Sequence, residues 1–554
     1  MTGSGPGAPA PRPRRGYSLA RAGGIMAAGT LVSRVTGFLR QLALVSVLGL
    51  GVVNDSYTVA NTLPNIVYEL LLGGVLTSIM VPLLVRAQTD DPDGGEAYTR
   101  RLLTVAGAAL VLATLVAMAT APLLTRLYLG DGDGPANPDL ATAFAWLLLP
   151  QIFFYGLGAL LGALLNTRGV FGPFAWAPVL NNVVVIAVLA VYAAMPGPLS
   201  LDPVRMGEPK LLVLGLGTTL GIAVQALVLI PAVRRTGFRY RPLWGWDRRL
   251  GDAGGLALWV VAYVLIGQVG YIVTTRVAAD AAPGSVAIYA NAWLLLQVPY
   301  GVLGVSLLTA LMPRMSRAAA EGRTTDVVAD LALGIRLSAV VLLPVSVLLT
   351  LFGTELGVAL FSLGAGAADG GSARLGATLA ASAFGLLPFA VVMLQLRVFY
   401  ALTDSRTPTL LQLLIVGVKV PLLLAAPLVL PPDRVVLGLA AANASAFVVG
   451  AVAGQVVLHR RLGRLGTGTV LRAVLRLAVA AAFAGALALG VVLLLRPAVP
   501  DLGPIARAWI ELGVAAAVGG PAVVGAMLAL RVPEITTLGQ RVLPRRFRRA
   551  GSAS

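Results

Sequence analysis

The sequence predicts an all-α polytopic membrane protein with about fourteen transmembrane helices. Of its 554 residues, 57% are hydrophobic and only 12% are charged, and the mean hydropathy of +0.86 lies far above that of soluble domains. The apolar residues come in runs of about 20, the length that an α-helix needs to cross a bilayer. Arginines gather between alternate runs, which is typical of loops that stay on one side of a membrane.

Fourteen apolar runs follow one another along the chain. The first six spans are predicted near residues 24–50, 57–85, 102–125, 139–166, 174–195 and 210–233. The next six are predicted near residues 254–279, 285–312, 327–352, 374–401, 408–429 and 434–458. Two further spans are predicted near residues 470–495 and 505–530.

The charges between the spans predict the topology. Loops expected in the cytoplasm are rich in arginine, and they contain Arg86, Arg100, Arg101, Arg168, Arg234, Arg235, Arg314, Arg317, Arg406, Arg460 and Arg461. Loops expected outside carry acidic residues instead, namely Asp55, Asp131, Asp280, Glu355, Asp433 and Asp501. We therefore expect a multi-pass protein of the plasma membrane with both termini in the cytoplasm. Residues 1–22 are expected to form a disordered basic tail, and residues 532–554 a second basic tail that contacts anionic lipids.

An internal repeat predicts two related halves. The segment Gly73-Gly74-Val75 with Pro82 has a counterpart in Gly304-Val305 with Pro313, and Leu148-Leu149-Pro150 recurs as Leu386-Leu387-Pro388. The paired spans are six apart, an even number, so both halves cross the membrane in the same direction. We expect two six-helix lobes, residues 23–235 and 236–465, related by a pseudo-twofold axis along the membrane normal. Residues 466–531, with the last two spans, stand outside the repeat.

Composition excludes several kinds of chemistry. The chain has no cysteine and a single histidine, which excludes thiolate metal sites and histidine clusters. Its only lysines, Lys210 and Lys419, do not follow glycine, so the Gly-Lys-[Ser/Thr] of a phosphate-binding loop is absent. We therefore expect no catalytic residues, no metal and no cofactor. The net charge of +18 lies in the loops between spans, a pattern that favours anionic lipids over nucleic acid as a partner.

Charged residues inside the spans are the candidate functional groups. Arg34 and Arg40 lie in the first span, where an arginine facing lipid would cost at least about 2.5 to 3.5 kcal/mol. They predict a polar cavity that admits an anion, because a guanidinium can bind pyrophosphate through two parallel hydrogen bonds. The alternative is an internal salt bridge with Glu69, Asp55 or Asp280.

Four further charged residues within predicted spans are singled out. These are Glu69, Arg276, Arg397 and Lys419, and each is a candidate functional residue by its position alone. Arg276 and Asp280 are four residues apart and could instead pair with each other.

Short motifs then carry a resemblance to a known family. The segment Ser33-Arg34-Val35-Thr36-Gly37-Phe38-Leu39-Arg40, followed by Gly49-Leu50-Gly51, Asp55 and Leu63-Pro64-Asn65, resembles the MurJ (MviN) family of lipid II flippases. The segment Pro299–Val305 matches as well, and the resemblance extends from about residue 24 to 531, with actinobacterial members the most similar in character. It implies the fold of the multidrug/oligosaccharidyl-lipid/polysaccharide exporters.

The resemblance implies that the chain moves an undecaprenyl-pyrophosphate-linked peptidoglycan precursor, lipid II, to the outer leaflet by alternating access. It implies functional roles for Arg34, Arg40 and Asp55, and a groove for the lipid tail on the last two spans. The substrate-binding residues expected in this chain are Arg34, Arg40, Asp55, Asn65, Glu69, Arg276 and Arg397. Cell-wall synthesis and division proteins are candidate partners.

The chain departs from the family pattern at several positions. Gln41 follows Arg40 where the family often has aspartate, Tyr68-Glu69 stands where it often has two arginines, and Leu294 replaces an arginine of the eighth span. Arg276 is a candidate replacement for one of these. Two alternative functions stay open at this point: an exporter of drugs or of other lipid-linked oligosaccharides, and a non-transporting scaffold of cell-wall synthesis.

Overall fold

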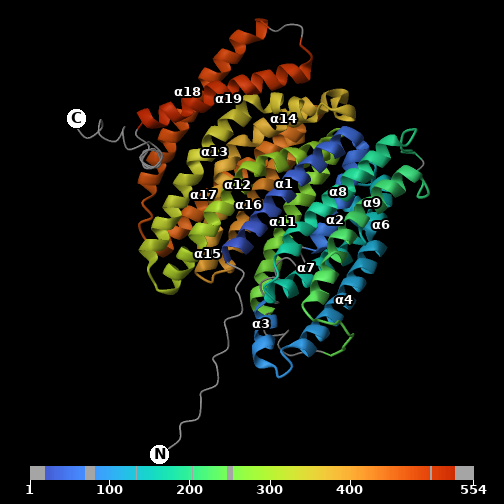
Figure 1. Ribbon diagram of the computed structural model, residues 1–554. Coiled ribbons are helices and arrows are strands. Elements are labelled where there is room, and N and C mark those ends of the chain that lie inside the picture. The colour runs from blue at the N-terminus through green and yellow to red at the C-terminus, as the bar shows by residue number, and fades with distance from the viewer. Residues whose placement is uncertain are drawn as a thin grey trace, which may run out of the picture.

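The computed structural model describes residues 19–68, 81–132, 134–202, 204–245, 254–498 and 502–530. These residues form α-helices joined by short 3-10 helices and turns (Figure 1). Thirteen helical segments among them are long and apolar enough to cross a membrane, which confirms the prediction of an all-α polytopic protein. The remaining predicted span, residues 57–85, is described only at its two ends, because residues 69–80 lie outside the described part.

The helices follow the order of the predicted spans. The first half contains α1 (Leu19–Leu48), α2 (Val52–Tyr68), α3 (Val81–Asp90), α4 (Glu96–Ala119), α5 (Ala121–Leu129), α6 (Pro138–Leu148), α7 (Gln151–Thr167), α8 (Gly172–Ala194), α9 (Pro209–Leu227) and α10 (Leu229–Arg235). The second half contains α11 (Gly254–Ala281), α12 (Ser285–Ala320), α13 (Thr324–Phe361), η4 (Gly364–Gly370), α14 (Gly371–Ser382), η5 (Ala383–Gly385), α15 (Leu386–Ala401), α16 (Arg406–Val429) and α17 (Val435–Leu462). The chain continues into α18 (Thr467–Leu495) and α19 (Pro504–Ala529).

The two halves form two bundles that lie side by side (Figure 1). In the first bundle α1 packs on α8, α8 on α9, and α9 on α6 and α7, while α4 packs on α7. In the second bundle α11 packs on α16, α16 on α17, and α13 on α14. Helices α18 and α19 pack against each other and against α13 at the edge of the second bundle.

Corresponding helices of the two bundles are broken at corresponding places. The predicted fourth span is divided into α6 and α7 at Leu149-Pro150, and the tenth into α14 and α15 at η5, just before Pro388. Proline lacks the N–H that would continue a helix and clashes with the preceding turn. The repeated Leu-Leu-Pro motif therefore produces the same break twice, as the internal repeat predicts.

Glycines allow the helices of the second bundle to approach closely. The Cβ of an alanine at Gly353 of α13 would lie 2.7 Å from the carbonyl oxygen of Gly376 in α14, and one at Gly376 would collide with the backbone of Gly353. Such small-residue contacts are typical of helix packing in lipid, where no hydrophobic force drives helices together.

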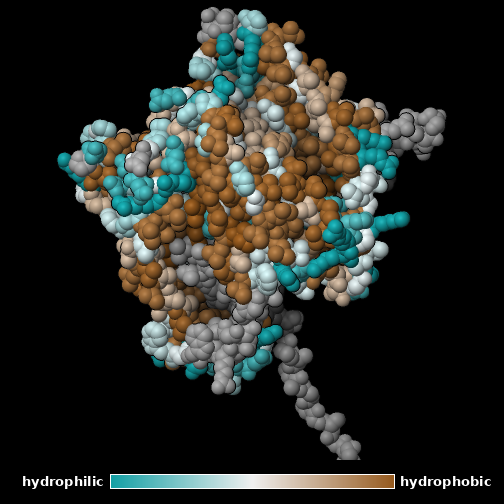
Figure 2. Space-filling view, turned by 180° about the vertical axis from the view of Figure 1, so that it is seen from behind, coloured by the Kyte–Doolittle hydropathy of each residue, from teal (hydrophilic) through white to brown (hydrophobic). Residues whose placement is uncertain are grey.

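The surface has the distribution expected of a membrane protein. Many large apolar side chains are exposed, among them Leu112, Leu220, Val479 and Phe483. Figure 2 shows hydrophobic residues across the middle of one face and hydrophilic ones mainly towards its margins. We call the end of the bundles that carries Arg100, Arg168, Arg317 and Arg406 the basic end.

Candidate functional site

Arg34 of α1 reaches the second bundle. The residue is exposed, and its guanidinium lies against Gly301 of α12, where a Cβ would collide with Nη1. Glycine at position 301 therefore leaves the space that the guanidinium occupies. This contact places a charged group of the first half directly at the boundary with the second.

Arg40 lies further along α1 and is half-buried. It is close enough to the hydroxyl group of Tyr57 in α2 to interact with it electrostatically. Among the residues that the structure describes, neither Arg34 nor Arg40 forms an ion pair. Of the three acidic partners considered for them, Asp55 and Asp280 are engaged elsewhere, and Glu69 lies outside the described residues.

Asp55 of α2 caps the first turn of α12. Its Oδ2 accepts a hydrogen bond from the backbone N–H of Gly284 at 2.7 Å, and its Oδ1 accepts one from Ala287 at 2.8 Å. The first N–H groups of a helix have no partner within it and carry its positive dipole end, so a carboxylate is well suited to this place. The side chain is only 2% exposed. Asp55 thus joins the two bundles through a carboxyl group shielded from solvent.

Backbone contacts surround this cap. Gly284 has φ 81°, a conformation that favours glycine, and a Cβ there would collide with the carbonyl oxygen of Leu50. Gly364 of η4 lies similarly close to the carbonyl oxygen of Ser46. The C-terminal end of α1 is therefore packed directly on the second bundle. We call this end of the molecule the closed end.

A further hydrogen bond joins the two bundles between the Asp55 cap and the contact of Arg34 with Gly301. Nε2 of Gln41 in α1 donates to Oδ1 of Asn291 in α12 at 2.9 Å, and the Asn291 amide in turn donates to the carbonyl of Ala287. Gln41 is the residue that stands where the family often has aspartate. An uncharged amide at this position can pair with Asn291 without burying a charge.

Nearer the basic end, side chains of α12 and α1 are exposed. Leu294 and Val298 share the α12 face that carries Gly301, because they precede it by about two turns and one turn. They are 36% and 45% exposed. On α1, Leu31 is 63% exposed. The face between the bundles is thus sealed near Asp55 and accessible near Arg34.

Arg397 of α15 is an exposed arginine of the second bundle. It is close enough to interact electrostatically with the hydroxyl groups of Tyr263, Tyr300 and Tyr400. Tyr300 directly precedes Gly301, the residue that Arg34 contacts. The fold therefore brings Arg34 and Arg397, far apart in sequence, to adjacent residues of α12.

Arg276 lies in a different place from the one expected for a cavity residue. Its Nε pairs with Asp280 at 3.3 Å, and its Nη1 donates to the carbonyl of Arg126 in the last turn of α5 at 3.1 Å. Both contacts are near the C-terminal end of α11, at the closed end. The pairing alternative considered for Arg276 is therefore the arrangement observed, and Arg276 does not occupy the position of the missing arginine at Leu294.

The two remaining expected site residues are Asn65 and Glu69. Asn65 is half-buried in α2 and donates to the carbonyl of Asn61 at 3.3 Å within its own helix. Glu69 lies outside the described residues. Their predicted roles in substrate binding stay predictions.

An ion cluster attaches the last two helices to the second bundle. Arg496, just after α18, donates to both carboxylate oxygens of Glu511 in α19 at 2.9 and 3.0 Å, and to Glu355 of α13 at 2.9 Å. The hydrogen bonds to Glu511 raise the pKa of Arg496 above its usual value. Sequence reasoning missed this cluster because its members are 15 and 141 residues apart and no local pattern joins them.

Replacing Arg496 by alanine should loosen α18 and α19. Glu511, 7% exposed in its side chain, would lose its only bidentate partner among the described residues, at a cost of about 1 to 3 kcal/mol. We expect a midpoint of thermal unfolding lower by several degrees for the purified protein in detergent. Arg496→Lys, which keeps the charge, should recover part of the loss. An unchanged midpoint for Arg496→Ala would show that the cluster does not hold these helices.

Two bundles that are sealed at one end and expose arginines between them at the other define a membrane transporter. Solved structures share this architecture. One described as "Lipid II flippase MurJ, inward closed conformation" matches with a TM-score of 0.71 and 16% identity over 91% of this chain and 99% of its own. An inward-facing multidrug resistance transporter of the MATE family and MOP superfamily matches with a TM-score of 0.58 and 15% identity over 82% and 97%.

Sequence comparison identifies the family. The family model described as "Lipid II flippase MurJ" matches residues 44–499, so the chain belongs to the MurJ family. A lipid II flippase MurJ of Burkholderia cenocepacia is 30% identical over 68% of this chain and 72% of its own length. A probable lipid II flippase MurJ of Rhizobium meliloti is 28% identical over 82% and 83%.

Proposed function

We propose that this protein carries lipid II from the cytoplasmic to the outer leaflet of the plasma membrane by alternating access. The observation that carries the proposal is the contrast between the ends of the α1–α12 boundary, where Asp55 seals one end and Arg34 is exposed towards the other. The arginine-rich loops support a cytoplasmic location of the basic end. The described arrangement then corresponds to a state that is closed towards the outside.

The pyrophosphate of the substrate would bind the exposed arginines. Arg34 and Arg40 are six residues apart, which is about 9 Å along the helix, so they offer two successive positions on one route. Arg397 adds a third guanidinium, on the second bundle, together with tyrosine hydroxyls that can donate to phosphate or sugar oxygens. Charge-assisted hydrogen bonds of this kind are stronger than neutral ones.

Opening towards the outside would require α12 to leave Asp55. The carboxylate and the helix end form a discrete contact that can be made or broken as a unit, which suits a two-state transporter. A negative cell interior favours the outward movement of an anion by about 2.3 kcal/mol per charge for each 100 mV. The cycle needs no covalent step and no cofactor.

The polyprenyl tail would remain in lipid along α18 and α19. These helices lie at the edge of the bundle, and α18 exposes Leu475, Val479 and Phe483 by 55%, 61% and 61%. Anionic lipids at the basic loops and proteins of cell-wall synthesis are further partners in this proposal.

The function can be tested by complementation. In a strain depleted of its own lipid II flippase, expression of this chain should restore growth and return lipid II to the outer leaflet, measured as the fraction accessible to an external enzyme that cleaves it. Restored growth while lipid II stays in the inner leaflet would favour a scaffold role. Export of a cationic dye with no effect on lipid II would favour a drug exporter.

A further inference from the structure

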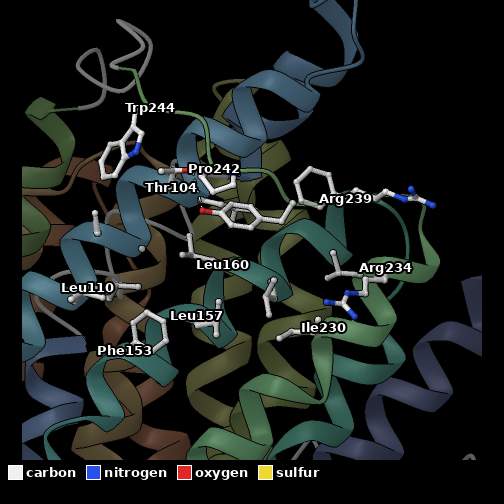
Figure 3. A pocket seen from close by; sticks show the side chains of 18 residues that line it. Thr104, Leu110, Phe153, Leu157, Leu160, Ile230, Arg234, Arg239, Pro242 and Trp244 are labelled. Carbon is white, nitrogen blue, oxygen red and sulfur yellow. Dashed lines mark hydrogen bonds between the residues drawn. The ribbon is translucent and has the colours of Figure 1, made fainter.

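A cavity lies outside the boundary between the bundles. It has a volume of about 990 Å³ and is lined by α4, α7, α10 and the segment 236–245, which leads from the first half of the chain towards the second (Figure 3). Its volume is at the upper end of the range of small-molecule sites, about 300 to 1,000 Å³. None of the proposed substrate contacts belongs to it.

The cavity is on the outer side of the first bundle. Phe153 and Leu157 of α7 line it. Gly162, two and a half turns after Phe153 and so on the opposite face of α7, packs on Phe174 of α8. The helices that α4, α7 and α10 contact most extensively all belong to the first half. The cavity therefore faces the surrounding lipid and not the space beside Arg34.

Its wall is largely apolar. On α4 it extends from Leu103 to Val111, about 12 Å along the middle part of the helix. Val111 is 46% exposed, and Ala108 is exposed beside it. A flexible hydrocarbon chain can enter from the membrane between these residues and α7.

The rim at the basic end is cationic. Arg234 of α10 and Arg239 of the following segment line the cavity and are both exposed. Figure 3 shows both arginines on one side of the cavity and Trp244 on the other. A hydrocarbon wall below two guanidinium groups matches a molecule with an acyl chain and an anionic head.

The segment 236–245 forms the roof of the cavity, and it is attached to α4 through Thr104. The hydroxyl groups of Thr104 and Tyr240 share a hydrogen bond of 3.1 Å, and the backbone N–H of Leu243 donates to Thr104 Oγ1 at 3.1 Å. The carbonyl of Arg239 accepts a further bond from Arg100 at 3.2 Å. These bonds hold the segment that connects the two bundles over the cavity.

We propose that this cavity binds an anionic glycerophospholipid of the adjoining leaflet. One acyl chain lies between α4 and α7, and the headgroup phosphate lies between Arg234 and Arg239. The attraction between basic side chains and anionic lipid at a membrane surface supplies the selectivity. Because the roof is the connection between the bundles, the bound lipid also steadies this connection against the first bundle.

The charge requirement can be tested by native mass spectrometry of the purified protein, titrated with phosphatidylglycerol or phosphatidylcholine. We expect one tightly retained phosphatidylglycerol, with phosphatidylcholine binding at least about tenfold more weakly. The double variant R234Q/R239Q should lose this preference. The matched control R460Q/R464Q removes two exposed arginines from the basic end of α17 and its following turn, and should bind as the original chain does.

The acyl-chain requirement is tested at Gly107. This glycine lines the cavity, and a Cβ there would meet no atom within 4 Å, so Gly107→Trp can fill the entrance without disturbing the helix. It should abolish retention, while Gly513→Trp on α19, in equally open space, should not. Equal binding of both lipids, equal loss in both arginine double variants, or displacement of phosphatidylglycerol by a polyprenyl pyrophosphate would each overturn the proposal. None of these readouts depends on lipid II transport.

Discussion

Replacing Arg34 by alanine should abolish complementation of a flippase-depleted strain while the protein remains in the membrane. The guanidinium is exposed between the bundles, so its loss removes a docking group without removing a described ion pair. Losing charge-assisted hydrogen bonds worth about 1.5 to 3 kcal/mol should weaken lipid II binding about 10- to 100-fold. Binding is measured by native mass spectrometry, and protein level by immunoblot of membranes.

Matched variants separate charge from geometry. Arg34→Lys keeps the charge but lacks the planar fork that binds phosphate through two bonds, and it should bind with intermediate strength. Arg40→Ala should also fail to complement. Arg460→Ala, at an exposed position on α17, should behave as the original chain. Full complementation by Arg34→Ala or Arg40→Ala would contradict their assignment as pyrophosphate-binding residues.

Replacing Asp55 by alanine should open the closed end and stop transport. The change removes the acceptor for two backbone N–H groups of α12, those of Gly284 and Ala287. Since each bond to a charged group is worth about 1.5 to 3 kcal/mol, the closed state should become at least about tenfold less populated. Asp55→Asn should show a similar defect, because its amide nitrogen cannot accept from a backbone N–H.

The chain has no cysteine, so a single introduced cysteine can report on this closure. Val298→Cys places a thiol on the α12 face beside Gly301, where the native side chain is 45% exposed. A membrane-impermeant maleimide added outside the cell should label it poorly in the original background and several-fold more in Asp55→Ala. Asp139→Ala removes an exposed first-turn aspartate of α6 and serves as the control. Unchanged labelling together with normal growth would exclude Asp55 as the seal.

The order of the helices could be predicted because, in lipid, each apolar segment forms a helix independently of the rest of the chain. Backbone groups in a bilayer have no water to bond, so each apolar run must satisfy its own hydrogen bonds as a helix, and the bilayer sets its length. The repeated Leu-Leu-Pro motif likewise predicted related halves, and the breaks at Pro150 and before Pro388 agree with it. The resemblance carried by the segment Ser33–Arg40 identified the family correctly.

The geometry of the site could not be predicted in the same way. Arg276 was a candidate cavity residue by its position in a span, but its contacts with Asp280 and Arg126 lie at the closed end. No periodicity indicates which span meets which, and the contacts of Gln41 with Asn291 and of Arg34 with Gly301 depend on the packing of separate bundles. The interaction of Arg397 with Tyr300, the residue before the Gly301 that Arg34 contacts, likewise depends on this packing.

The sequence determines the class of protein, the order of the spans and which spans contain charged residues. It does so because these properties depend only on the hydropathy and charge of each segment. The role of each charged residue depends on the residues it contacts, and these are distant along the chain. Asp55 bonds to Gly284 and Ala287, 229 and 232 residues away, and only the docking of one bundle on the other turns it into the cap of a helix. The same docking brings Arg34 against Gly301 of α12 and leaves it exposed.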